Sequence, residues 1–166
     1  MVVFDTSILL LLLHPDAKPP IDPATKMAVE KAAERITHLV DVLSNAKEKI
    51  IIPTPVLSEL LVHAGEATSQ YLDVLNGQAV FRIAPFDQKA AIEAAIAMGE
   101  AISRGGIRVD ATDSDATRGK VKFDRQIIAI AKAEGASAVY SDDGDVVKYA
   151  GQAGLKAYRT IDLDLP

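Results

Sequence analysis

The chain has 166 residues, of which 49% are hydrophobic, and it contains no cysteine. This length suits one compact domain over residues 1–166, and the lack of cysteine excludes disulfide frameworks, zinc–thiolate sites and thiol catalysis. The formal net charge of -5 argues at first against nucleic-acid binding, which usually requires a basic surface. The apolar run 8–13 is too short to span a membrane and follows no basic residue, so we expect a cytoplasmic protein without a membrane anchor or signal peptide.

Short apolar runs alternate with longer segments of helical periodicity along the chain. The short runs predict strands and the periodic segments predict helices. The predicted strands are 1–4, 50–53, 80–83, 138–140 and 155–158. The predicted helices are 6–13, 24–47, 56–63, 67–75, 87–102, 123–134 and 143–150. Residues 105–119, which are rich in Gly, Asp, Ser and Thr, are predicted to lack regular structure.

This alternation predicts an α/β fold, a three-layer α/β/α sandwich around a mainly parallel central sheet with right-handed crossovers. Ligands of such folds bind beyond the carboxyl ends of the strands. The order of the elements shows no internal repeat and no boundary that would divide the chain into two domains. The residues that follow the strands are therefore the first candidates for a functional site.

Carboxylates recur at these positions. Asp5 follows the first strand, Glu59 lies on the helix after the second, Asp124 opens the helix before the fourth, and Asp142 and Asp143 follow the fourth. Each acid alone is more readily explained as a helix cap, a turn residue or an exposed helical residue. Their recurrence at one end of successive strands favours a shared site. Oxygen ligands without His or Cys select hard ions such as Mg²⁺ or Mn²⁺, which serve phosphoryl chemistry.

Four segments that carry these acids match a known pattern in order and spacing. They are 2–7 with Asp5, 52–60 with Glu59, 123–131 with Asp124, and 138–145 with Asp143. Together they resemble the PIN-domain nucleases, and among them the VapC-type toxin ribonucleases. The chain departs from the family pattern at Asp142, at Arg125, and in the length of segments 14–49 and 105–119.

The resemblance implies a PIN-like fold and a metal-dependent endoribonuclease, the toxin of a type II toxin–antitoxin pair. It implies that Asp5, Glu59, Asp124 and Asp143 are the catalytic residues and hold one or two Mg²⁺ or Mn²⁺ ions. RNA phosphodiester bonds would be hydrolysed to products with 5′ phosphates. Ser7, Ser141 and Asp142 would support these acids without reacting. The resemblance further implies a homodimer and a cognate antitoxin that covers the acidic site.

Basic residues lie close to Asp124 in the sequence. One interpretation is a rim that contacts RNA phosphates, and the other is a set of solvated charges. The four residues are Arg118, Lys120, Lys122 and Arg125. Removing the four candidate acids from the charge count of -5 leaves -1. The acidity therefore gathers where divalent ions would bind, and we expect RNA affinity to depend on the metal.

Two alternatives belong to other functional classes. A haloacid-dehalogenase-type phosphatase also begins with a strand that ends in Asp, but that family places a second Asp and then a Thr where this chain has Ser7 and Leu9. A PIN-like protein that processes or binds RNA outside a toxin system is the other alternative. A cleavage assay with Mg²⁺ or Mn²⁺ against EDTA distinguishes these functions.

Overall fold

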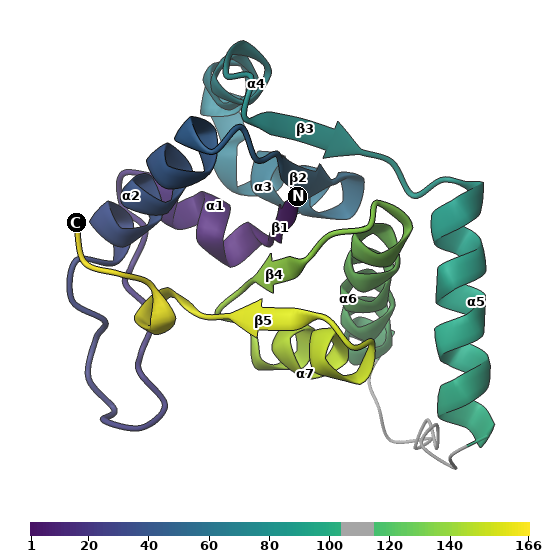
Figure 1. The fold of residues 1–166 in the computed structure, drawn as a ribbon. Coiled ribbons are helices and arrows are strands. Elements are labelled where there is room, and N and C mark those ends of the chain that lie inside the picture. The colour runs from purple at the N-terminus through teal and green to yellow at the C-terminus, as the bar shows by residue number, and fades with distance from the viewer. Residues whose placement is uncertain (104–114) are drawn as a thin grey trace.

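The computed structural model describes residues 1–103 and 115–166, with side chains for 1–103 and 119–166. Five strands form one sheet, in which every neighbouring pair is parallel (Figure 1). In chain order they are β1 (Val2–Phe4), β2 (Ile50–Pro53), β3 (Phe81–Ala84), β4 (Ala138–Tyr140) and β5 (Lys156–Tyr158). The predicted α/β fold and all of its predicted strands are confirmed, with β1, β3 and β5 each beginning one residue later than expected.

Helices fill the connections between the strands. The α-helices are α1 (Thr6–Leu13), α2 (Ala32–Asn45), α3 (Thr54–Ala64), α4 (Thr68–Gly77), α5 (Gln88–Ser103), α6 (Asp115–Ala133) and α7 (Gly144–Gln152). Two short 3₁₀ helices are η1 (Gly65–Ala67) and η2 (Thr160–Asp162). No helix among the described residues is long and apolar enough to cross a membrane.

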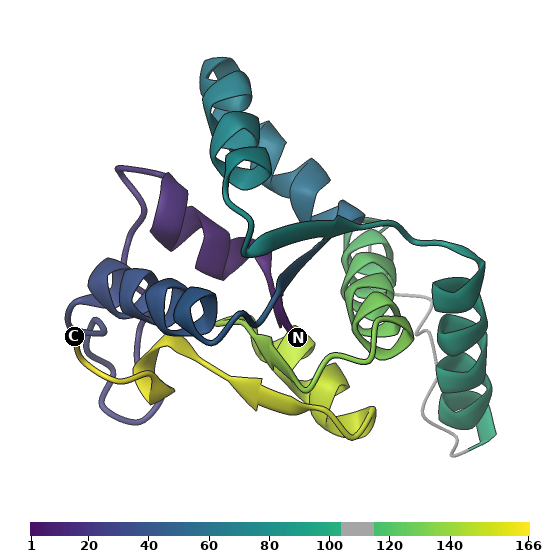
Figure 2. The same cartoon turned by 45° about the horizontal axis from the view of Figure 1, so that its top comes forward.

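The sheet order is β3-β2-β1-β4-β5, so the chain changes direction across the sheet at β1. It steps outward from β1 to β3, then returns past β1 to β4 and β5. Because parallel crossovers are right-handed, helices of the two halves cover opposite faces. Figures 1 and 2 show α1 to α4 on one side and α5 to α7 on the other. The switch point between β1 and β4 is where ligands bind in sheets of this kind.

The central strands are buried on both faces. Val3, Ile51 and Val139, one from each of β1, β2 and β4, are fully buried. Such strands read as continuous apolar runs because helices cover both of their faces. Phe4 meets Tyr140 edge to face, with ring centroids 5.5 Å apart, at the carboxyl ends of β1 and β4. This packing gives the adjoining loops a rigid base.

The predicted helix 24–47 is wrong in its first part, because α2 begins at Ala32. The Asp22 side chain accepts hydrogen bonds from the backbone N–H of Ala24 and the hydroxyl of Thr25. Further along, Lys26 and Lys31 have positive φ angles of 60° and 52°. An Asp side chain that accepts hydrogen bonds from the residues just after it favours a turn over a helix. Residues 22–25 therefore form a turn in place of the predicted first helical turn.

The helix predicted over 123–134 begins earlier, since α6 starts at Asp115. Residues 115–119, which we expected to be irregular, are helical, and residues 104–114 lie outside the described residues. Asp124 therefore lies within the helix instead of opening it. A Lys–Asp pair four residues apart, Lys120 and Asp124, stabilises this part of the helix.

Candidate functional site

The site is built at the switch point of the sheet. The backbone N–H of Asp5, directly after β1, donates to the carbonyl of Tyr140 at the end of β4. The segment from Ser141 to Asp143 then leaves β4 beside Asp5. Pairing of β1 with β4 thus brings together two predicted site segments that are separated by more than 130 residues in the chain.

Asp5 is almost completely buried, at 5% exposed. Its Oδ2 accepts hydrogen bonds from Ser141 Oγ at 2.6 Å and from Ser7 Oγ at 3.2 Å. Burial, with a smaller contribution from the charge of Glu59, raises the pKa of Asp5 to about 6 against the opposing effect of these bonds. Asp5 thus carries a negative charge in a place that disfavours it, which a nearby cation would relieve.

Glu59 reaches the same region from α3. Its Oε2 accepts a hydrogen bond of 2.6 Å from the hydroxyl of Thr6, the residue next to Asp5. Glu59 itself is exposed. Thr6 thus fixes one carboxylate oxygen of Glu59 close to Asp5.

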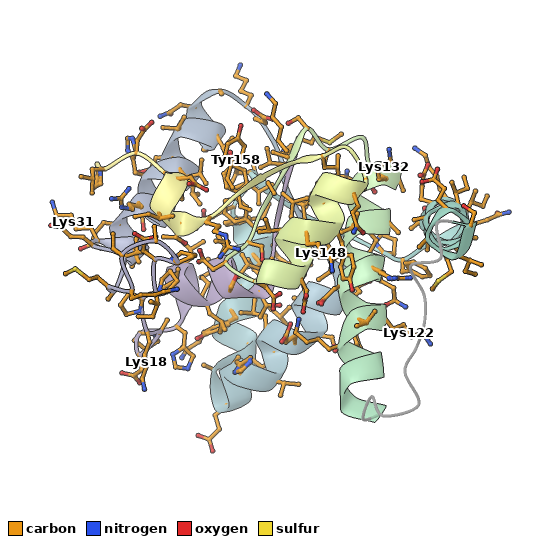
Figure 3. The ribbon with its side chains drawn as sticks, turned by 90° about the horizontal axis from the view of Figure 1, so that it is seen from below. Lys18, Lys31, Lys122, Lys132, Lys148 and Tyr158 are labelled. Carbon is orange, nitrogen blue, oxygen red and sulfur yellow. The ribbon has the colours of Figure 1, made fainter. Side chains whose placement is uncertain are left out.

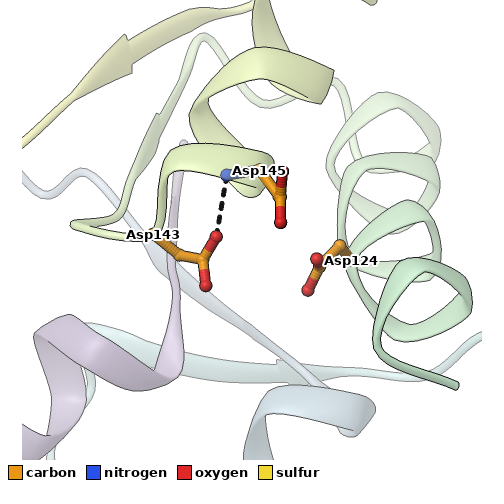
Figure 4. A group of neighbouring side chains, drawn as sticks. All are labelled: Asp124, Asp143 and Asp145. Atoms are coloured by element: carbon orange, nitrogen blue, oxygen red, sulfur yellow. Dashed lines mark hydrogen bonds between the residues drawn. The ribbon is translucent and has the colours of Figure 1, made fainter. Parts of the chain in front are cut away.

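A second group of acids lies between α6 and α7. One carboxylate oxygen from each of Asp124, Asp143 and Asp145 lies within 4.8 Å of the others. Figure 4 shows the three side chains pointing toward one another, with Asp143 and Asp145 at the start of α7 and Asp124 on α6. We call these three residues the acidic triad. Its all-oxygen donor set fits Mg²⁺ or Mn²⁺.

Capping of α7 orients Asp143. Its Oδ1 accepts hydrogen bonds from the backbone N–H of Asp145 at 2.8 Å and of Val146 at 3.4 Å. Its Oδ2 remains to face the triad and lies 3.0 Å from the Nζ of Lys120. Burial acts to raise the pKa of Asp143, but the bonds from Lys120 and Asp145 outweigh it and lower the pKa. Asp143 is therefore ionised at neutral pH.

Asp124, the buried member of the triad, behaves differently. Burial raises its pKa, and the charges of Asp143 and Asp145 add to this, against the effect of Lys120. For Lys120 itself, burial opposes the charged form, but Asp124 and Asp143 together raise its pKa above the ordinary lysine value. The ammonium is therefore charged at neutral pH and does not serve as a base.

Ser141 joins the two groups of acids. Its hydroxyl donates to Asp5 and accepts a 3.0 Å bond from the backbone N–H of Asp143. The hydroxyl of Ser7 also donates to Asp5, and it accepts a 3.1 Å bond from the backbone N–H of Asp142. Ser7 and Ser141 therefore each link Asp5 to the loop that carries Asp142 and Asp143.

The side chain of Asp142 is engaged elsewhere. Its two oxygens accept from the backbone N–H of Thr160 at 2.9 Å and from the hydroxyl of Thr160 at 2.6 Å. Thr160, which begins η2, is fully buried. Asp142 thus holds the segment after β5 against the loop after β4, and its carboxylate lies outside the acidic triad.

The predicted basic rim is not a single cluster. Lys120 lies among the acids, whereas Lys122, two residues on, is exposed and points away from them, because residues i and i+2 lie on different sides of a helix (Figure 3). The guanidinium of Arg125 lies over the ring of Tyr149, 5.4 Å from its centroid, and donates to the sulfur of Met98. The side chain of Arg118 lies outside the described residues.

A cavity of about 350 Å³ lies beside the site. Ser7 and Asp142 form its border with the acids, and α1 and the following loop form much of the rest. His14, Lys18 and His63 also line it. Both histidines therefore lie near the site, but among the described contacts neither forms a hydrogen bond with its carboxylates.

The sequence alone did not indicate the contacts that three residues make in this site, namely Asp145, Lys120 and Thr6. Asp145 was indicated only by the run 142–145, and the i,i+4 spacing of Lys120 and Asp124 was the one available indication of their pairing. Thr6 carried no such indication, because its contact with Glu59 spans 53 positions.

Neither the protein-family models nor the curated protein sequences give a match to this sequence. Solved structures match its fold over almost its whole length. A chain of VapBC2 from Rickettsia felis, bound to a DNA fragment from their promoter, has a TM-score of 0.59 at 18% identity, covering 96% of this chain and 98% of that chain. A chain of DNA-bound VapBC from Salmonella typhimurium has a TM-score of 0.56 at 16% identity, covering 96% and 97%.

A third structure is VapC20 of Mycobacterium tuberculosis, a Sarcin-Ricin loop cleaving toxin. Its TM-score is 0.51 at 15% identity, covering 90% of this chain and 95% of that chain. This protein thus has the PIN-domain fold of VapC structures, as the four sequence segments predict. At such identities the likeness establishes the fold alone.

Proposed function

We propose that this chain is a metal-dependent endoribonuclease and the toxin of a type II toxin–antitoxin pair. The observation that carries the proposal is the acidic triad, whose oxygens lie within 4.8 Å of one another near the switch point of a VapC-like fold. Asp5 and Glu59 add two carboxylates at the same edge of the sheet. Carboxylates gathered in this way are stable together only with a compensating cation.

The residues present fit Mg²⁺ or Mn²⁺. Asp124, Asp143 and Asp145 would hold the ion, together with Asp5 and Glu59, directly or through water. Such an ion lowers the pKa of an attacking water and neutralises charge on the phosphate and on the departing oxygen. Cleavage would leave 5′ phosphates, as the resemblance implies.

The protein's own part is to hold these oxygens in place. The α7 cap leaves Oδ2 of Asp143 facing the triad, and Ser141 and Ser7 hold Oδ2 of Asp5. Thr6 restrains Glu59 in the same way. Ligands fixed in this manner need little reorganisation when the substrate phosphate arrives.

The partners follow from the same proposal. The substrate is RNA, and the protein partner is a cognate antitoxin, since two of the similar structures are VapBC assemblies. We expect the chain to form a homodimer in the cytoplasm. Light scattering on the purified protein measures the dimer. Growth arrest on expression, relieved by the product of a small upstream gene, tests the antitoxin.

The decisive experiment measures cleavage of structured and unstructured RNA in Mg²⁺ or Mn²⁺ and in EDTA. We expect cleavage only with metal. Asp124→Asn and Asp143→Asn should each slow cleavage by about 100-fold or more, since even the partners of metal ligands contribute 10–100-fold. Asp73→Asn, an exposed acid on α4, is the matched control and should cleave normally.

Two outcomes would contradict the proposal. Cleavage that continues unchanged in EDTA, or in both asparagine variants, would show that the triad is not the reactive site. RNA binding without cleavage under any metal condition would instead favour a PIN-like RNA-binding protein.

A further inference from the structure

A cation of the chain itself lies inside the acidic triad. The Nζ of Lys120 is 2.9 Å from Oδ2 of Asp124, 3.0 Å from Oδ2 of Asp143 and 3.3 Å from Oδ2 of Asp145. One ammonium thus contacts all three carboxylates that could share a metal ion. No other described residue contacts the triad in this way.

The ammonium and a metal ion would compete for the same space. Mg²⁺ binds carboxylate oxygens at about 2.1 Å, so an ion shared by three oxygens lies between them. That is where Nζ lies, close to 3 Å from each oxygen. A divalent ion can therefore use these oxygens together only after the ammonium has moved out.

Lys120 is able to move out at little cost to the fold. Its side chain is 48% exposed, and its ammonium makes its described contacts only with the triad. Lysine has a flexible four-carbon stem, so the charged end can turn to solvent while the backbone of α6 remains in place.

The charges explain why the metal-free protein needs a cation there. Three ionised carboxylates within 4.8 Å would repel one another, and the ammonium reduces their summed charge from -3 to -2. A divalent ion neutralises more of this charge than an ammonium. Binding of the ion would therefore be favourable, but weakened by the loss of three ion pairs.

We propose that Lys120 is a tethered cation that occupies the metal position of the metal-free protein and is displaced when a divalent ion binds. The inference rests on the metal site of the proposed function and concerns how that site is kept ready. Lys120 thus stabilises the empty triad and sets a threshold for metal binding.

The test is a calorimetric titration of the metal-free protein with Mn²⁺. Lys120→Met removes the ammonium and keeps most of the stem. We expect it to lower the Kd for Mn²⁺ by about tenfold, the effect of three partly exposed ion pairs. Lys120→Arg keeps the charge and should stay near the wild-type Kd. Lys122→Met, on another side of the same helix, is the matched control and should not change the Kd.

Thermal unfolding provides a second readout that does not depend on catalysis. In EDTA, Lys120→Met should unfold at a lower temperature than the wild type, because its triad lacks a cation. In saturating Mg²⁺ the difference should shrink or reverse, since the metal ion then supplies the cation of the triad in both proteins. A difference of the same size in both solutions would overturn the inference.

The outcomes separate this inference from the proposed function. If Mn²⁺ binds the wild type and Lys120→Met equally, or binds the variant more weakly, Lys120 does not compete and only the inference fails. If neither protein binds Mn²⁺, the metal site itself is wrong and both proposals fall. Loss of binding in Asp143→Asn, together with tighter binding in Lys120→Met, would support both.

Discussion

Asp5 illustrates at the residue scale how a residue of the candidate site can work against stability. Its burial raises the pKa of the carboxyl from 3.8 to about 6. The folded state therefore holds this proton more tightly than the unfolded chain does. The resulting stabilisation is complete below about pH 4 and is lost as the pH rises toward 6.

Replacing Asp5 by asparagine should therefore stabilise the metal-free protein at pH 7.5. The shift of about two pKa units corresponds to a gain of roughly 1–3 kcal/mol in the free energy of unfolding, since each unit is worth 1.36 kcal/mol. Urea denaturation in EDTA measures the gain, which should fade near pH 4. A variant that is less stable than the wild type at pH 7.5 would contradict this reading of the site.

Asp142 makes the opposite prediction, because its carboxylate serves the fold. Asp142→Ala leaves the buried N–H and hydroxyl of Thr160 without their acceptors. We expect a loss of about 1–3 kcal/mol in the free energy of unfolding. The Kd for Mn²⁺ should stay the same, as calorimetry can check. Asp41→Ala, an exposed acid on α2, should change neither quantity.

At the scale of elements, the full length of α6 brings Lys120 and Asp124 to the same site. Its early start at Asp115 places Lys120 and Asp124 on consecutive turns, facing the first turn of α7. Packing of α6 against both α5 and α7 accompanies this extension. The helix that begins at Phe123 in the sequence prediction would have left Lys120 in a loop.

The extended helix can be tested at Gly119. A methyl group at this position would meet no atom within 4 Å. Because glycine inside a helix costs about 0.5–1 kcal/mol relative to alanine, Gly119→Ala should raise the free energy of unfolding by up to that amount. Gly154→Ala is the contrasting variant. Gly154 has a φ of 74°, which alanine rarely adopts, so this variant should have a lower free energy of unfolding. An unstable Gly119→Ala would indicate that α6 begins later.

At the scale of the whole molecule, the net charge of -5 shapes how RNA is bound. Lys120 is engaged with the triad, and Arg125 is held against Tyr149. We therefore expect weak RNA binding in EDTA and tighter binding with Mg²⁺. Fluorescence anisotropy measures the affinity, and a gel run on the same samples checks that the RNA is intact.

The salt dependence of this binding reports on the exposed lysine. If Lys122 contacts a phosphate, Lys122→Ala should reduce the slope of log K against log salt by about 0.7, the value for one contact on a single strand. A slope that is unchanged in the variant would assign Lys122 to the solvated surface. Strong binding in EDTA would contradict the dependence on metal.

Much of this fold could be predicted from local pattern. The strands predicted at 50–53 and 138–140 match the structure, and the strand predicted at 1–4 begins one residue later. Such strands can be predicted because a strand that is covered on both faces is a short continuous apolar run. The start of α2 was missed because Asp22 forms a turn that competes with helical periodicity. The start of α6 was missed because its first turns have few apolar residues and therefore show no helical periodicity.

The sequence by itself determined that acids follow the strands, since parallel strands place their carboxyl ends at one edge. Only the tertiary structure decided which acids meet. Glu59 lies near Asp5 because it accepts a hydrogen bond from Thr6, the next residue. Asp124 lies near Asp143 and Asp145 instead. It also decided that Lys120 lies between the latter three. The physical reason is that distances between side chains on separate helices depend on how those helices pack, which no spacing along the chain records.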